Sequence, residues 1–208
     1  MLDSETLTGF FFAAMVLALV PGPDNLYVLT QSVLLGRRAG LVATFGFCTG
    51  LVVHTLGVAL GAAALLQASS LAFSLLKFCG AGYLIYLAWC FLGTTETGGG
   101  VSGLAEPSPW RLYSRGIIMN VTNPKVALFF LAFLPQFTDP GAGPVVWQMV
   151  LFGLLFMLAT LLVFGSVALL ATGIASGLMQ RLRVQLRIRR LAALIFLLLA
   201  IRLAVAGN

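Results

Sequence analysis

Residues 6–34 read TLTGFFFAAMVLALVPGPDNLYVLTQSVL, an apolar run that is interrupted by Pro21, Gly22 and Pro23. A transmembrane helix needs about 20 predominantly apolar residues. Proline removes a backbone donor and clashes with the preceding helical turn, so we expect the helix to unwind here and to begin again after the prolines. The stretch therefore predicts a broken transmembrane helix.

The rest of the chain has the same apolar character. Of its 208 residues, 60% are hydrophobic and 9% are charged, against about a quarter charged in a soluble domain. We predict an all-α integral membrane protein with six transmembrane helices, at residues 6–34, 40–66, 70–93, 113–134, 145–171 and 189–206. The last segment is short and contains Arg202, so a five-span chain is the alternative.

Basic residues in the connections predict the orientation. Nine of them fall between, or at the edges of, spans one and two, three and four, or five and six: Arg37, Arg38, Arg111, Arg115, Arg181, Arg183, Arg187, Arg189 and Arg190. The positive-inside rule puts these connections in the cytoplasm and both termini outside it. The net charge of +6 is thus explained by topology, and we expect no nucleic-acid partner.

Residues 94–112, which include three consecutive glycines, are predicted to be a flexible cytoplasmic linker. The linker separates a first three-helix repeat, residues 1–93, from a second, residues 113–208. Because three is an odd number, the second repeat enters the membrane in the opposite direction. This arrangement corresponds to two inverted-topology repeats, an architecture that is common in secondary transporters.

A second break is predicted in the fourth span, the first of the second repeat, where Asn120 is followed by Val-Thr and then by Asn123, Pro124 and Lys125. Asn123 with Pro124, like Gly22 with Pro23, is a good pair to cap and begin a helix. The two restarted half-helices would have converging N-termini, which suit an anion such as a carboxylate. The alternative is that the prolines only kink the helices for packing.

Asp24 and Lys125 each follow one of these breaks directly, and Asn25 comes next after Asp24. Ionisable residues inside a span are costly and suggest function. The pair could bind the ammonium and carboxylate of a zwitterion, and Asp24 could carry a coupled proton. Alternatively, Asp24 caps its half-helix and Lys125 snorkels or pairs with it permanently.

His54 and Lys77 are two further candidates, inside spans two and three. Either could belong to an ion path. Equally, a lone histidine can be satisfied by a neighbouring hydroxyl or carbonyl, and Lys77 can snorkel to the surface.

Glycines at spacing four, Gly46 with Gly50 and Gly57 with Gly61, indicate closely packed helices and make a homodimer plausible. The sequence has no cysteine cluster with metal spacing, no nucleotide-binding glycine loop and no nucleophile elbow. We therefore expect no metal, no cofactor and no enzymatic activity.

Five ordered stretches, spread over nearly the whole chain, resemble the LysE/RhtB family of amino-acid exporters. They are PGPDNLY at 21–27, GRRAG at 36–40, KFCGAGYL at 77–84, NPK at 123–125 and FLPQF at 133–137. The resemblance implies export of amino acids or their derivatives across the inner membrane of a bacterium, driven by an ion gradient. The motifs are closer to the homoserine, threonine and leucine branch than to the lysine and arginine branch.

The residues and the resemblance together favour a proton-coupled exporter of neutral amino acids that works by alternating access around the two broken helices. A passive channel or facilitator for small zwitterionic solutes is the main alternative. A membrane-embedded enzyme or scaffold subunit is a further one.

Overall fold

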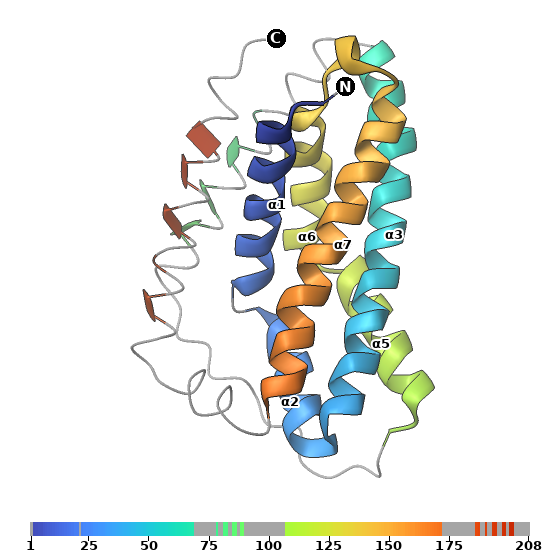
Figure 1. Ribbon diagram of the computed structural model, residues 1–208, viewed down its shortest axis with the longest axis vertical. Coiled ribbons are helices and arrows are strands. Elements are labelled where there is room, and N and C mark those ends of the chain that lie inside the picture. The colour runs from blue at the N-terminus through green and yellow to red at the C-terminus, as the bar shows by residue number, and fades with distance from the viewer. Residues whose placement is uncertain are drawn as a thin grey trace.

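The computed structural model describes residues 2–20, 22–68 and 107–171, and separate helical positions at 78, 81–82, 85–86, 88–89, 186–187, 190, 193–194, 197–198 and 200–201. Within these residues every regular element is a helix. The helices lie side by side along one axis (Figure 1). The predicted third and sixth spans fall mostly outside the described residues.

The first predicted span is broken as expected. Helix α1 comprises Ser4–Leu19, helix α2 begins at Pro23 and runs to Leu35, and their axes differ by 61°. Gly22 caps α2 with an extended backbone, and Pro23 is its first residue. Asn25 donates a 2.7 Å hydrogen bond to the carbonyl of Ala18 and so satisfies one of the orphaned acceptors at the end of α1.

The fourth predicted span is broken in the same way. Helix α5 comprises Pro109–Val121 and helix α6 comprises Pro124–Leu128, and the bend between them is 49°. The chain continues from α6 through a π-helical turn, η1 (Phe129–Phe133), and a 3-10 turn, η2 (Leu134–Phe137). In Figure 1 both breaks lie at about mid-height of the molecule.

Two unbroken helices run the length of the molecule between these broken pairs. They are α3 (Arg37–Ala68) and α7 (Val145–Leu170). Their apolar stretches, Arg37–Gly61 and Val145–Leu170, contain 25 and 26 residues with mean hydropathies of 1.8 and 2.5. At 1.5 Å per residue each spans about 38 Å, enough to cross a hydrocarbon layer about 30 Å thick. Within the described residues, two helices are thus long and apolar enough to span a membrane, and up to four spans result if each bent pair counts as one.

Small residues bring α3 against its neighbours. A Cβ atom on Gly50 would lie 2.7 Å from the Asn120 side chain, and one on Gly46 would collide with the carbonyl of Tyr113 on α5. The predicted packing role of these two glycines is confirmed. Gly57 and Gly61 differ, since no described atom lies within 4 Å of a Cβ built on either.

Two groups of buried apolar side chains fill the bundle. The first is rich in phenylalanine and links α1, η1, η2 and α7: Phe10, Phe129, Phe130, Phe133, Phe137, Phe152 and Phe156. The second joins α2, α3 and α7, with Val28, Phe47 and Phe164 among its members. Ring pairs inside the first group have centroids 4.7 to 6.4 Å apart, the range of favourable aromatic contacts.

Candidate functional site

The two breaks meet in the interior. Nδ2 of Asn123 donates a 2.7 Å hydrogen bond to Oδ2 of Asp24, although the two residues are 99 positions apart. The ammonium of Lys125 donates a 3.3 Å hydrogen bond to the carbonyl of Leu17, in the last turn of α1. Each broken helix thus supplies a polar contact to the other.

Asn123 fills two roles at once. Its Oδ1 accepts the backbone N–H of Lys125 at 3.0 Å, which caps α6, while its Nδ2 donates to Asp24. The predicted pairing of Asn123 with Pro124 at the start of a helix is therefore confirmed, and Pro124 is the first residue of α6.

Asp24 and Lys125 are both buried, with 3% and 9% of their surfaces exposed. They do not hydrogen-bond to each other: Oδ2 of Asp24 is held by Asn123, and its Oδ1 has no partner. Burying two charges away from water is expensive unless they are paired and fully hydrogen-bonded. This incompletely paired arrangement has a cost that helix packing alone does not explain.

A small cavity lies between the breaks, with a free volume of about 10 Å³, room for about one water molecule. Its walls come from α1, α2, the α5–α6 break and α7: Leu17, Ala18, Asp24, Asn120, Lys125, Val126, Phe156, Thr160 and Phe164. Ligand pockets for small molecules usually measure about 300 Å³ or more. The cavity as it stands is therefore too small to hold an amino acid.

Three buried acceptor oxygens at the breaks have no hydrogen-bond partner among the described residues: Oδ1 of Asp24, Oδ1 of Asn25 and Oδ1 of Asn120. Two of these residues, Asp24 and Asn120, line the cavity. Buried polar groups are almost always satisfied, and an unpaired one costs about 1 to 3 kcal/mol. Unused acceptors beside an ammonium can pair with the donor and the acceptor of a ligand that carries both.

His54 contacts the break through the backbone. Its Nε2 lies 3.1 Å from the carbonyl oxygen of Asn120, and its ring is 5.7 Å from that of Phe130. Since a carbonyl only accepts, Nε2 carries the proton in this contact. This geometry is the carbonyl-satisfied arrangement that the sequence left open for a lone histidine, and it attaches α3 to the end of α5.

Of the other predicted site residues, three lie in the described part of the chain at or near the first break and two lie outside it. Gly22 lies beside the lysine, since a Cβ atom built on it would be 3.4 Å from Nζ of Lys125. Pro23 and Asn25 lie in the first turn of α2. Pro21 and Lys77 lie outside the described residues.

Sequence reasoning missed the contribution of α7. Phe156, Thr160 and Phe164 line the cavity from this helix. Thr160 is buried, and it is one of few polar residues in an otherwise apolar stretch. An isolated hydroxyl in the middle of a span is the signal that could have pointed to it.

No three His, Cys, Asp or Glu side chains are grouped to bind a metal within the described part of the chain. The fold and the site define a helical membrane protein with a small cavity between two broken helices, lined by both polar and apolar residues. The chain belongs to the LysE type translocator family, which matches residues 15–207. The protein is accordingly a membrane transporter by family.

The names of similar proteins are consistent with membership of this family. The chain is 33% identical over 171 residues to proteins called "Homoserine/homoserine lactone efflux protein" from Salmonella typhimurium and Salmonella typhi, covering 80% of this chain and 81% of each relative. It is also 33% identical over 134 residues to a "Leucine efflux protein" from Salmonella choleraesuis, covering 64% of this chain and 63% of the relative. No solved structure matches the chain.

Proposed function

We propose that this protein is a secondary active exporter of neutral amino acids or their derivatives, of the homoserine, threonine or leucine type, and that it couples export to protons. Membership of the translocator family and the names of its relatives support amino-acid export. The coupling and the neutral substrate are inferences from the site.

The observation that carries the proposal is the composition of the cavity between the breaks. It combines unpartnered acceptors on Asp24 and Asn120 with the ammonium of Lys125. An amino-acid zwitterion offers the complementary groups, since its ammonium donates to the free oxygens and its carboxylate accepts from Lys125. Binding would pair the charges that are unpaired in this structure.

The buried lysine also favours a neutral side chain on the substrate. A substrate with a second positive charge would bring like charges together where water does not screen them. The walls opposite the polar groups are apolar, including Phe156 and Phe164. An aliphatic or hydroxylated side chain suits such walls.

Proton coupling would use Asp24. The free Oδ1 of this carboxylate can either bind a proton or pair with the ammonium of a substrate. Because it cannot do both at once, release of the substrate on one side would be linked to uptake of a proton there, as antiport requires. His54 and Lys77 remain candidates for the path that protons take to this carboxylate.

The membrane arrangement is part of the same proposal. Six spans in two inverted repeats would place the breaks at mid-membrane in a bacterial inner membrane, with both termini outside the cytoplasm. The small cavity would belong to an intermediate in which the substrate site is collapsed, and alternating access would open it to one side at a time by separating the half-helices.

Reconstituted vesicles test this function. Amino acids loaded singly should leave the vesicles against their gradient when a pH gradient is imposed, and collapse of that gradient should stop the accumulation. Asp24→Asn and Lys125→Ala should abolish this transport while the protein still inserts. Asp139→Asn, a change at an exposed acid that caps the turn Pro140–Ala142 and lines no part of the cavity, should not. Transport that only follows the substrate gradient would instead make the protein a facilitator.

A further inference from the structure

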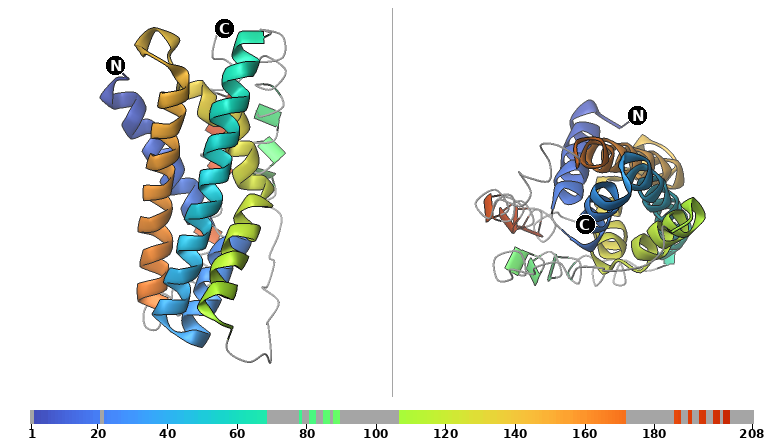
Figure 2. Two further views of the ribbon diagram at one scale, coloured as in Figure 1. Left: turned by 90° about the vertical axis from the view of Figure 1, so that its right-hand side faces the viewer. Right: turned by 90° about the horizontal axis from the view of Figure 1, so that it is seen from below.

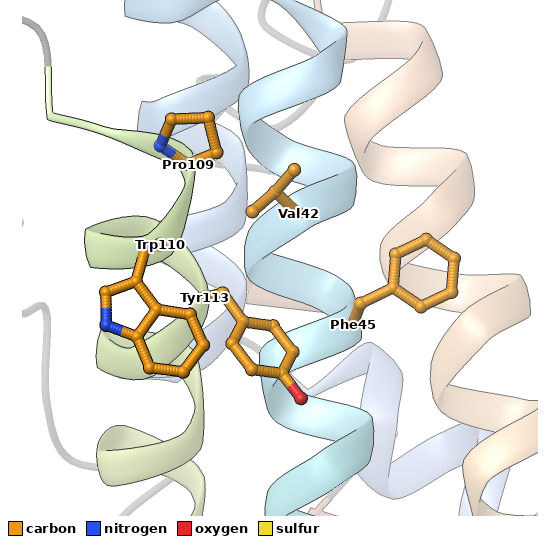
Figure 3. Close-up of a pocket in the computed structure, with 5 residues that line it drawn as sticks. All are labelled: Val42, Phe45, Pro109, Trp110 and Tyr113. Atoms are coloured by element: carbon orange, nitrogen blue, oxygen red, sulfur yellow. The ribbon is translucent and has the colours of Figure 1, made fainter.

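A hollow lies on the outside of the bundle between the second and third turns of α3 and the start of α5, separate from the cavity at the breaks. It has a volume of about 290 Å³ and is lined by Val42 and Phe45 of α3 and by Pro109, Trp110 and Tyr113 of α5. Figure 3 shows the rings of Trp110 and Tyr113 side by side, with Tyr113 reaching from α5 toward α3. The hydroxyl of Tyr113 hydrogen-bonds to Thr49 of α3 at 2.8 Å, which fixes this wall.

A second hollow of about 200 Å³ adjoins the first and shares Val42 and Pro109 with it. Its lining includes Arg38, in the first turn of α3. Arg38, Val42 and Phe45 follow one another at spacings of four and three, so they form one stripe along α3. The stripe covers about 10 Å of helix, with the cation at the helix end and the apolar side chains further in.

The chemistry of this groove matches the boundary between water and lipid. Tryptophan and tyrosine prefer the headgroup level of a bilayer. Trp110 is 72% exposed and Phe45 is 57% exposed, so both present apolar surface that an acyl chain can cover.

Charge distinguishes which lipid fits. The starts of α3 and α5 carry the arginines Arg37, Arg38 and Arg111. The starts of α1 and α7 lie at the opposite end of the bundle (Figure 2). The exposed acids Asp3 and Glu5 belong to the start of α1, and the exposed Asp139 bonds to Gln148 in the first turn of α7. Basic residues near a membrane surface attract anionic headgroups. A zwitterionic headgroup gains less from such a site.

We propose that this groove binds one anionic phospholipid, with its phosphate on Arg38 and the start of an acyl chain against Val42, Phe45 and Trp110. The lipid joins the start of α5 to α3, whereas His54 joins the last turn of α5 to α3. It thus stabilises the packing of the two helices that carry Gly50 and Asn120. The proposal does not depend on which solute the protein exports.

Native mass spectrometry of the detergent-purified full chain tests this site. Phosphatidylglycerol and phosphatidylcholine with identical acyl chains are titrated separately. The first lipid molecule to bind should show an affinity about fivefold or more higher for phosphatidylglycerol than for phosphatidylcholine. This is the gain expected from about 1 kcal/mol of attraction between one arginine and an anionic headgroup.

Two pairs of variants locate the lipid. Arg38→Gln should remove the preference for phosphatidylglycerol. Arg37→Gln, a change at a neighbour that is also exposed but does not line the groove, should keep it. Trp110→Ala should weaken both lipids, whereas Trp147→Ala, which removes a tryptophan of similar exposure (71%) from α7, should weaken neither.

Equal affinities for the two lipids would overturn the proposal. So would equal losses in Arg37→Gln and Arg38→Gln, because attraction would then be spread over the surface. A lipid-free dimer that Trp110→Ala dissociates would also overturn it, since the groove would then be filled by a second copy of the chain.

Discussion

Asn123 and Asp24, 99 positions apart in the chain, are joined by a 2.7 Å hydrogen bond from the asparagine amide to the carboxylate. The same asparagine caps α6. Through this one side chain, the start of one half-helix is held against the start of the other. In the proposed alternating-access mechanism, separation of the breaks would break this bond.

Replacing Asn123 separates its two roles. Asn123→Ala should lose about 1 kcal/mol for the missing cap and about 1.5 to 3 kcal/mol for the hydrogen bond to a charged group. Asn123→Ser, which retains a capping hydroxyl, should lose mainly the second contribution. Thermal unfolding in detergent should rank wild type above Asn123→Ser and Asn123→Ser above Asn123→Ala. Equal stability of the two variants would show that the cap contributes nothing.

Gly50 sets the distance between α3 and Asn120. Gly50→Ala should destabilise the protein by about 1 to 3 kcal/mol and reduce export, because the added methyl group would lie 2.7 Å from the Asn120 side chain. Gly57→Ala is the matched control in the same helix, where a Cβ meets no described atom within 4 Å. It should be neutral or stabilising by up to about 1 kcal/mol. Unfolding midpoints of the two variants that coincide would contradict this account.

Phe156 closes the cavity on the α7 side and packs against Phe129 and Phe130, with ring centroids 5.3 and 5.1 Å apart. Phe156→Ala should cost about 3 kcal/mol or more, as large-to-small changes in packed interiors do, and should let protons or solute leak. Phe12→Ala removes a ring that is 69% exposed and should change stability by less than about 0.5 kcal/mol. Vesicle leak assays and unfolding curves measure both effects; a tight, stable Phe156→Ala protein would refute the closing role.

His54 is expected to position the end of α5 through its bond to the Asn120 carbonyl. His54→Gln can still donate to this carbonyl and should keep pH-driven export, whereas His54→Leu leaves the carbonyl without its partner and should lose about 1 kcal/mol of stability and much of the transport. Export under an imposed pH gradient distinguishes the roles. If His54→Gln moved substrate only down its own gradient, the histidine would belong to the proton path instead.

The breaks and their caps could be predicted because they follow from local chemistry. Pro23 and Pro124 each begin a helix, and Asn123 accepts the N–H of Lys125 two residues away. Such contacts involve neighbours in the chain, so the order of residues is enough to anticipate them.

Contacts between distant helices could not be predicted from the order of residues. Gly46 with Gly50 and Gly57 with Gly61 have the same spacing, yet only the first pair packs against α5. That Asp24 bonds to Asn123 and not to Lys125, and that Phe156 and Thr160 complete the cavity, depends on how α2, α6 and α7 approach one another. The π-helical turn at Phe129–Phe133 has no signal in its apolar residues.

Equilibrium binding to the detergent-purified protein tests the central claim, that Asp24, Asn120 and Lys125 together hold an amino-acid zwitterion. The exported amino acid is compared with its analogues that lack the carboxylate or the ammonium. Each analogue should bind about tenfold more weakly or worse, because one buried charge stays unpaired. In Lys125→Met, the analogue without a carboxylate should bind as well as the amino acid itself. Equal binding of all three compounds to the wild-type protein would contradict the account.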